Sequence, residues 1–330
     1  MPDKVILAVD ALGGDHAPAV VLEGVAAALA EDEGLELIVC GPADIVEPFA
    51  AGRARCSARP TTEFIDMGEH PAEAVRRKKD SSIVVGCRLV KEGAAAGFYS
   101  AGSTGACLAA ATLVMGRVKG LARPALTTVI PSPVRPVVMC DVGANADCKP
   151  EYLLQFAQMA TVYMREILHV EDPRVALVNI GEEETKGSAF AQEAFALLKA
   201  QLPNFAGNAE GGDILAANFD IFVTDGFTGN VCLKTIEGTS KTLFKALKEI
   251  FYTNAKTKLG ALAIKGGLTG LMERINPDTY GGAPLLGVKG ACIVGHGSSS
   301  ATAIKNGIHT TAEVVRRDLS GLLEKAVSKP

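Results

Sequence analysis

Val5-Ile-Leu-Ala-Val-Asp-Ala-Leu-Gly-Gly-Asp-His-Ala-Pro18 is the stretch that decides the fold. Its first five residues are all aliphatic, which is typical of a strand buried on both faces of a parallel sheet. Two glycines then permit a tight loop, and Pro18 opens an Ala- and Leu-rich segment that we expect to be helical. Strand, glycine loop and helix in this order predict an α/β sheet whose binding crevice lies at the carboxyl ends of its strands.

The same order of strand, glycine loop and helix recurs five more times. The further junctions are Ser100–Gly105, Asp141–Asn145, Asn179–Glu182, Asp225–Asn230 and Gly295–Ser299. Unpaired N–H groups and the positive dipole end at the start of a helix favour an anion there. The repetition predicts a site for phosphate or another oxyanion. Neither a Walker loop nor a dinucleotide fingerprint occurs, which weakens both nucleotide-binding interpretations.

Strand-like and helix-like segments alternate along the whole chain, which predicts a three-layer α/β/α sandwich around a mostly parallel sheet. Two strands close in sequence, 126–130 and 137–140, are expected to form a hairpin. No linker rich in Pro, Gly or Ser divides the chain, so we expect residues 1–330 to form a single domain.

Residues 253–275 predict one elaboration of this domain, a helical hairpin of two short helices that flank Gly266-Gly267. Lysines accompany its apolar side chains, as in elements that contact a membrane surface. A dimer contact, or ordinary packing on the core, is the alternative. The apolar residues assigned to the membrane-surface role are Leu259, Leu262, Ile264, Leu268 and Leu271.

Composition and charge exclude several classes of protein. Hydrophobic residues make up 48% of the chain and charged residues 21%, as in ordinary globular proteins. Aromatic residues are only 5% and Trp is absent, which argues against a base-stacking nucleic-acid surface. A net charge of −4 gives no general attraction to nucleic acid. Without a leader sequence or an apolar run of the ~20 residues that a membrane span needs, we expect a cytoplasmic protein.

Three side chains are candidates for catalysis. His16 could exchange a proton near neutral pH, or it could be a structural hydrogen-bonder. Lys186 follows three consecutive acids closely behind a strand and is the cation best placed to neutralise a phosphate, unless its loop is simply solvated. Asn230 lies at the start of a long helix, where its amide could stabilise an oxyanion or cap the helix.

The candidate phosphate-binding residues come from the glycine loops. They are Gly13, Gly14, Gly102, Ser103, Thr104, Gly105 and Asn145. No histidine stands at ligand spacing from another His or Cys, so we expect neither a metal nor another cofactor. Cys148 is a weaker candidate, as a nucleophile whose pKa the neighbouring Lys149 would lower, although no histidine base is near it in sequence.

Arg76, Arg77, Lys78 and Lys79 form the strongest basic run. Such a run is often a solvated helix face. On a chain of net negative charge it could instead dock an acidic partner or a phosphorylated substrate.

Read as whole strings, these loops resemble the bacterial PlsX family, the acyl-acyl-carrier-protein:phosphate acyltransferases. The strings occur in family order over nearly the whole chain; Ser103 stands where the family usually has Asn, and Leu12 where it usually has Met. The matching strings are Asp10–Pro18, Glu73–Ser82, Ser100–Gly105, Asp141–Pro150, Asn179–Gly187, Asp225–Asn230, Tyr280–Leu286 and His296–Ser299.

The resemblance implies a fold similar to phosphotransacetylases and isocitrate-type dehydrogenases, usually as a homodimer. It implies transfer of a long-chain acyl group from acyl carrier protein to inorganic phosphate, whose acyl phosphate product feeds phospholipid synthesis. Family members can associate with the membrane surface through a helical hairpin, which residues 253–275 match in position and character.

For this chemistry we expect Lys186 and the amides of residues 102–105 to hold phosphate. Asn230 would polarise the acyl carbonyl or help to bind phosphate, and His16 would protonate the leaving thiolate. Direct displacement is favoured over a Cys148 acyl-enzyme. Two other classes stay open: a metal- and NAD-dependent hydroxyacid dehydrogenase on a similar fold, and a non-catalytic membrane adaptor for lipid-synthesis enzymes.

Overall fold

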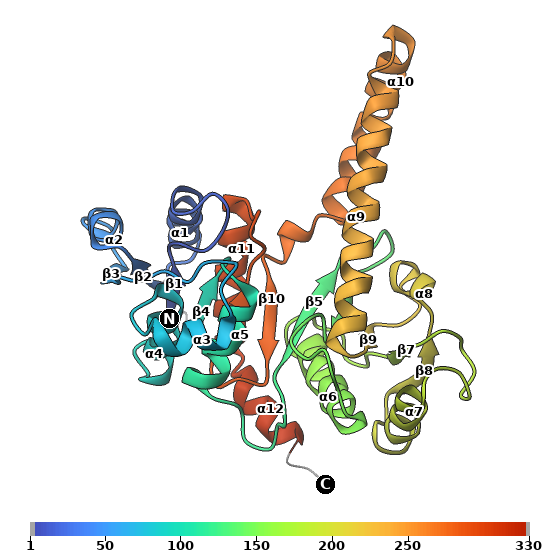
Figure 1. Cartoon of the computed structure of the whole chain (residues 1–330). Coiled ribbons are helices and arrows are strands. Elements are labelled where there is room, and N and C mark those ends of the chain that lie inside the picture. Colours follow the sequence, from blue (N-terminus) through green and yellow to red (C-terminus); the bar gives the residue numbers. More distant parts are fainter. Residues whose placement is uncertain (1–3, 328–330) are drawn as a thin grey trace.

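A single eleven-stranded sheet runs through the computed structural model, which describes residues 4–327 (Figure 1). The strand order is β3-β2-β1-β4-β11-β10-β5-β6-β9-β7-β8. The strands are β1 (Val5–Asp10), β2 (Leu35–Gly41), β3 (Cys56–Pro60), β4 (Gly97–Ser100), β5 (Ala125–Ile130), β6 (Val137–Cys140), β7 (Val175–Val178), β8 (Phe205–Ala209), β9 (Ile221–Val223), β10 (Ala283–Leu286) and β11 (Ala291–Val294).

Helices cover both faces of this sheet. They are α1 (Ala19–Glu31), α2 (Ala43–Ala50), α3 (Pro71–Arg77), α4 (Ser82–Lys91), α5 (Thr104–Ala110), α6 (Pro150–Glu166), α7 (Ala189–Gln201), α8 (Gly211–Ala216), α9 (Gly226–Phe251), α10 (Ala255–Arg274), α11 (Ala301–Arg316) and α12 (Leu319–Val327). A π-helical turn (Ala111–Met115) continues α5, and a 3₁₀ turn (Pro277–Thr279) follows α10.

Two separate hydrophobic clusters show that the sheet is the middle of three layers. Successive residues of β1 divide between them: Leu7 and Val9 pack with α1 and α11 on one face, and Ala8 packs with α4 and α5 on the other. This is the side-chain alternation of a strand that is buried on both faces. The predicted three-layer α/β/α sandwich is confirmed, as is the antiparallel hairpin of β5 and β6.

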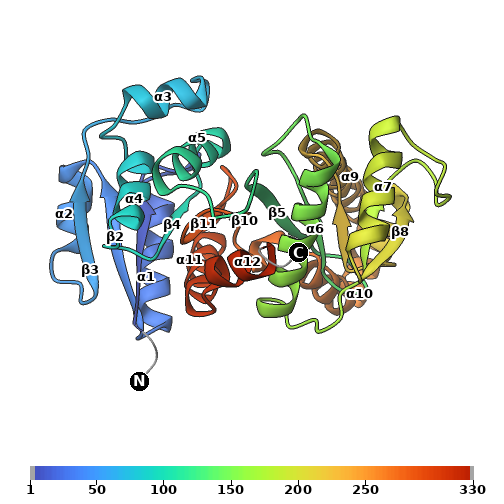
Figure 2. The same ribbon diagram turned by 90° about the horizontal axis from the view of Figure 1, so that it is seen from below.

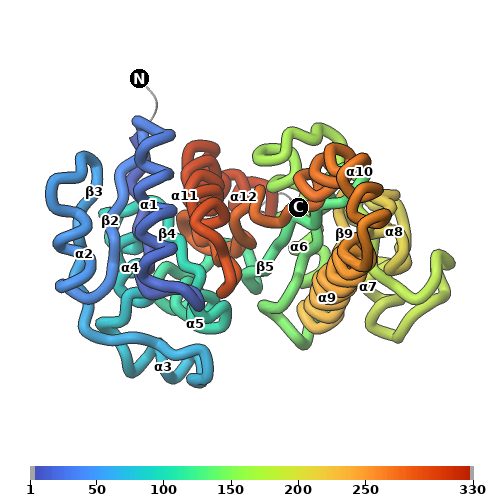
Figure 3. Tube along the Cα trace, turned by 90° about the horizontal axis from the view of Figure 1, so that it is seen from above, coloured from blue at the N-terminus to red at the C-terminus, as the bar shows by residue number. Residues whose placement is uncertain are grey.

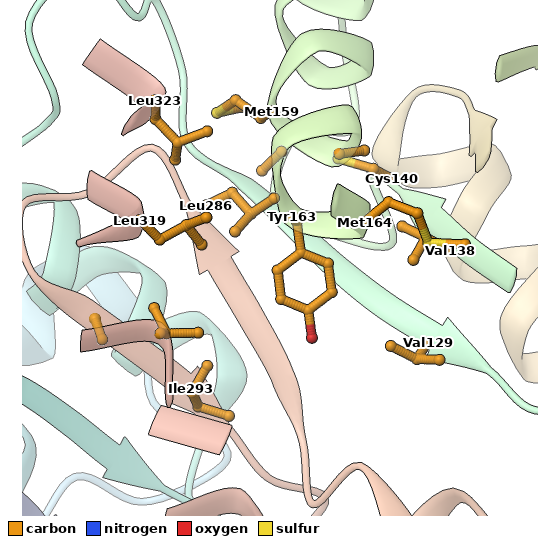
Figure 4. Close-up of a cluster of buried hydrophobic side chains, with 14 of the residues drawn as sticks. Val129, Val138, Cys140, Met159, Tyr163, Met164, Leu286, Ile293, Leu319 and Leu323 are labelled. Atoms are coloured by element: carbon orange, nitrogen blue, oxygen red, sulfur yellow. The ribbon is translucent and has the colours of Figure 1, made fainter. Parts of the chain in front are cut away.

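The last helices of the chain join the two halves of the molecule. α11 packs against α1, and α12 packs against α6, so the C-terminal segment lies between the halves (Figures 2 and 3). Figure 4 shows the cluster at this junction, where Met159 and Tyr163 of α6 lie near Leu286 of β10 and Leu319 of α12. The single domain predicted for residues 1–330 stays a prediction, and its ends, 1–3 and 328–330, lie outside the described residues.

Strand direction reverses in the middle of the sheet. The β11–β10, β10–β5 and β5–β6 pairings are antiparallel, and the other pairings are parallel. Three reversals leave β6, β9, β7 and β8 running in the opposite sense to β1, β4 and β11. The six glycine loops therefore leave the sheet as two groups, one after β1, β4 and β11 and the other after β6, β9 and β7.

The helical hairpin differs from its prediction. α10 is one continuous helix through Gly266-Gly267, and the hairpin consists of α9 and α10, which rise together away from the sheet (Figure 1). The chain turns at residues 252–254, where Asn254 caps α10 through the Lys256 and Thr257 N–H groups. The prediction of two separate short helices is thus wrong. Helix formation is cooperative, and good helix-forming residues on both sides of the glycine pair keep it helical.

No residue of α10 is buried, although the helix carries many apolar side chains. Leu259, Leu262 and Ile264 are exposed, while Leu268 and Leu271 are half-buried. Between residues 4 and 327, no helix is both long and apolar enough to cross a bilayer. Contact of these five side chains with a membrane surface stays a prediction.

Candidate active site

Asp10 organises the first group of loops from the end of β1. Its buried carboxylate accepts hydrogen bonds from the Leu12 N–H (3.0 Å) and from Ser100 Oγ (2.7 Å) at the end of β4. Ser100 Oγ in turn accepts the N–H of Gly102 (3.0 Å). Burial raises the pKa of Asp10, and these hydrogen bonds oppose the rise. Asp10 therefore links two glycine loops through one carboxylate.

Glycines allow the three loops of this group to pack closely. A Cβ on Gly13 would lie 2.6 Å from the Gly102 N atom, so only glycine fits there. Gly14 has a φ of +113°, a conformation that other residues rarely adopt. The Asp15 N–H donates to the Gly297 carbonyl (2.7 Å), which brings in the loop after β11. Six of the seven predicted phosphate-binding residues, Gly13, Gly14 and residues 102–105, thus lie in adjoining loops.

Backbone amides of these loops are left without protein acceptors. Within residues 4–327, the N–H groups of Gly13, Gly14, Ser103, Thr104 and Gly105 donate no hydrogen bond. Ser103 caps α5, because its Oγ accepts the N–H of Ala106 (3.4 Å). Unpaired amides at a glycine loop and a helix start form an anion-binding concavity.

Asp141 organises the second group from the end of β6. Its buried carboxylate accepts the N–H groups of Leu126 (3.0 Å), Ala144 (3.0 Å) and Asn145 (2.7 Å) and the side-chain amide of Asn145 (2.9 Å). Burial raises the pKa of Asp141, and these bonds oppose the rise. The Asn145 amide also donates to the Pro124 carbonyl (2.8 Å). Both of its N–H donors are used, one by Asp141 and one by Pro124, so a phosphate contact by this side chain would require it to rearrange.

Asn230 lies beside the same loop. α9 begins at Gly226, and Asp225 caps it by accepting the N–H of Thr228 (2.8 Å), so the alternative role of Asn230 as a helix cap is wrong. The Asn230 amide donates to the Val142 carbonyl (3.1 Å) instead. Stabilisation of an oxyanion by Asn230 stays a prediction.

Lys186 and His16 are both exposed. The Lys186 ammonium group has no ion pair or hydrogen-bond partner in the described part of the chain, whereas Glu184 of the same loop pairs with Lys199 (2.6 Å). The His16 ring likewise makes no hydrogen bond with residues 4–327, which removes support for a structural role. Lys186 therefore offers its full positive charge to an incoming anion.

A small apolar pocket lies between the two groups of loops. Its lining side chains are closely packed and leave no room for a water molecule. It begins at Thr104 of the first group and reaches Ala144 of the second, next to the loop of Asp141. The lining residues are Thr104, Leu108, Leu126, Ala144, Leu285 and Val294. Sequence reasoning missed this pocket, because its residues come from segments far apart in the chain and no local pattern marks them.

The basic run divides into two pairs. Glu69 accepts ion pairs from Arg77 (2.9 Å) and Lys78 (2.5 Å), so these two charges are already compensated. Arg76 and Lys79 are exposed, and their side chains make no hydrogen bond or ion pair with residues 4–327. Only Arg76 and Lys79 offer free positive charge for docking.

The environment of Cys148 contradicts its predicted activation. Burial, together with the negative charges of Asp141, Asp225 and Asp147, raises the pKa of the thiol to about 12. Its Sγ donates to the Asn145 carbonyl (3.5 Å). The predicted lowering of this pKa by Lys149 is wrong, because burial raises it most and the neighbouring carboxylates add to the rise. A thiol so rarely ionised is a poor nucleophile.

The fold is a mostly parallel α/β sandwich, and it is similar to the fold of phosphotransacetylases. A phosphotransacetylase from Streptococcus pyogenes superposes with a TM-score of 0.61 at 18% identity, covering 95% of this chain and 94% of the other. A branched-chain phosphotransacylase from Enterococcus faecalis superposes with a TM-score of 0.58 at 14% identity, covering 94% and 99%. At these identities the likeness concerns the fold alone.

Sequence comparison defines the family. A family model described as "Fatty acid synthesis protein" matches residues 5–321. Phosphate acyltransferases from Desulfitobacterium hafniense (48% identical over 97% of this chain and 96% of the relative) and Halothermothrix orenii (43%, 98% and 98%) are similar over nearly their whole lengths. The chain belongs to this family of phosphate acyltransferases, as the residue strings predicted, and it is an acyltransferase.

We predict that Cys148→Ala keeps kcat within about two-fold of the wild type, because no covalent step passes through this thiol. At pH 8 roughly one in ten thousand Cys148 side chains would be ionised, so alkylation by iodoacetamide should be slow. Cys148→Ser is the matched control for loss of the sulfur without loss of the hydrogen bond to Asn145. The prediction would be contradicted if Cys148→Ala showed no turnover and an acyl group were also trapped on Cys148 of the wild type.

Proposed function

We propose that this protein transfers a long-chain acyl group from acyl carrier protein to inorganic phosphate and so forms acyl phosphate for phospholipid synthesis. One observation carries the proposal: five unpaired amides gather in adjoining glycine loops, and one of their residues, Thr104, also lines the apolar pocket. Amides suit phosphate, and the apolar lining, once its side chains move apart, suits methylene groups near the reacting carbonyl. The name of the relatives, phosphate acyltransferase, supports the same acceptor.

The chemistry needs positioning more than proton transfer. A phosphate oxygen attacks the thioester carbonyl, a new C–O bond forms, and the C–S bond breaks to release the carrier's thiolate. Phosphate is partly dianionic near neutral pH and needs no strong base, so holding it against the carbonyl supplies much of the rate. In this scheme Lys186 and the amides of residues 102–105 hold phosphate, Asn230 stabilises the developing oxyanion, and His16 protonates the thiolate.

The carrier protein would meet the enzyme at α3. Arg76 and Lys79 are the free charges of this region, and acyl carrier protein presents an acidic surface to them. α3 also lies against the phosphate loops, since a Cβ on Gly105 would be 2.6 Å from Pro71 Cγ. Docking here would bring the acyl thioester close to the amides. Homodimer formation and contact of α9 and α10 with a membrane surface belong to the same proposal, with the exposed side chains of α10 as their support.

The defining experiment measures thiol release from palmitoyl-acyl carrier protein, with and without phosphate, in the absence of metal and NAD. We expect release that depends on phosphate and yields acyl phosphate, trapped as the hydroxamate by hydroxylamine. Equal release without phosphate would indicate a thioesterase, and no release would remove the proposal.

Lys186→Ala should raise the KM for phosphate by about ten-fold to a hundred-fold, which is the effect of one charge-assisted hydrogen bond. Steady-state kinetics at varied phosphate measure it. Lys199→Ala is the matched control, since it removes a nearby lysine that already pairs with Glu184. If both variants keep the wild-type KM and kcat, Lys186 does not contact phosphate.

Reversal of charge on α3 and the turn that follows it should weaken carrier binding alone. The double variant Arg76→Glu, Lys79→Glu is expected to raise the KM for acyl carrier protein by about three-fold to ten-fold at low salt, with the KM for phosphate unchanged. Lys91→Glu, at the far end of α4, is the control for net charge. An equal effect of Lys91→Glu would show that the contact is not located on α3.

A further inference from the structure

Three carboxamide side chains hold the loop that carries Lys186. Asn208 donates to the Glu183 carbonyl (2.9 Å), and Asn179 donates to the Lys186 carbonyl (3.2 Å). Gln192 of α7 donates to the carbonyls of Thr185 (2.8 Å) and Gly187 (3.3 Å). Four carbonyls of one short loop are thus bound by side chains from the end of β7, from β8 and from α7.

Asn208 is the buried member of this set. Only 4% of the residue is exposed, and its Oδ1 atom has no hydrogen-bond partner among the described residues. A buried acceptor without a partner destabilises the fold, so packing alone would favour an apolar residue of the same size. What the amide contributes is its one hydrogen bond, to the carbonyl of Glu183.

That carbonyl leads directly to Lys186. The Glu183 oxygen also accepts the backbone N–H of Lys186 (3.1 Å), so Asn208 and Lys186 meet on one acceptor. The loop has little freedom around this point. Gly187 has a φ of +92°, and a Cβ there would collide with the side chain of Asn179. The hydrogen bond from Asn208 therefore restrains the backbone from which the Lys186 side chain extends.

We infer that Asn208 is a positioning residue for Lys186. A lysine side chain is long and flexible, and the affinity it adds for an anion depends on how little freedom is lost when it binds. Asn208 fixes the Lys186 backbone before phosphate arrives and so limits that loss. This inference rests on the proposed function, because it takes Lys186 as a phosphate ligand.

Asn208→Leu tests the inference, because it removes the hydrogen bond and the unpartnered oxygen together. We expect the KM for phosphate to rise by about three-fold to ten-fold, the effect of one ordinary hydrogen bond. The melting temperature should not fall. Asn204→Leu is the matched control: Asn204 precedes the same strand and donates to the Pro173 carbonyl (2.6 Å) and Thr161 Oγ1 (3.2 Å), far from the loop. It should lower the melting temperature and leave the KM for phosphate unchanged.

A double-mutant cycle separates this inference from the proposed function. In a Lys186→Ala background, Asn208→Leu should raise the KM for phosphate no further, because its effect passes through Lys186. A full additional rise in that background would overturn the positioning role. An unchanged KM for phosphate in Asn208→Leu, together with a raised KM in Lys186→Ala, would also overturn the positioning role. If Lys186→Ala leaves the KM for phosphate unchanged, the proposed role of Lys186 fails, and the positioning role of Asn208 fails with it.

Discussion

A buried carboxylate at the end of a strand, accepting hydrogen bonds from neighbouring loops, is the interaction on which this site depends. Asp10 does this for the loops after β1 and β4, and Asp141 does it for the loop after β6 and the start of β5. Burial raises the pKa of both groups, which is a cost to the ionised form. The donors around each carboxylate offset that cost and give each loop one conformation.

The reversal of strand direction gives the site its layout. Because β10 and β5 join the two halves through antiparallel pairings, the loop groups organised by Asp10 and Asp141 belong to oppositely directed sets of strands. The apolar pocket lies where these sets meet, with Thr104 on one side and Ala144 on the other. α11 and α12 pack across the same junction and hold the halves together. In the proposed function, an acyl group and a phosphate approach each other at this junction of the two halves.

Much of the fold followed from local patterns. The aliphatic run of β1, the hairpin of β5 and β6 and the helices after the glycine loops could be predicted, because each depends on short-range periodicity and turn chemistry. The effect of Gly266-Gly267 was misjudged, because a local pattern of two glycines indicates a helix break. The helix continues through them in the structure. The pKa of Cys148 was also misjudged, because burial raises it most and Asp225, which is distant in sequence, adds to the rise; neither effect shows in the local sequence.

The sequence by itself determined the family, the alternation of strands and helices, and which loops could bind an anion, since all of these are written in contiguous strings. Only the tertiary structure decided which polar and charged side chains remain without a partner inside the described protein. The Asn145 amide is engaged by Asp141 and by the Pro124 carbonyl, and Arg77 and Lys78 are paired with Glu69. The Lys186 side chain stays unpaired, and its loop is held by the buried Asn208. The physical reason is that hydrogen bonds and ion pairs form between groups that folding brings together, and a linear chain does not show those partners.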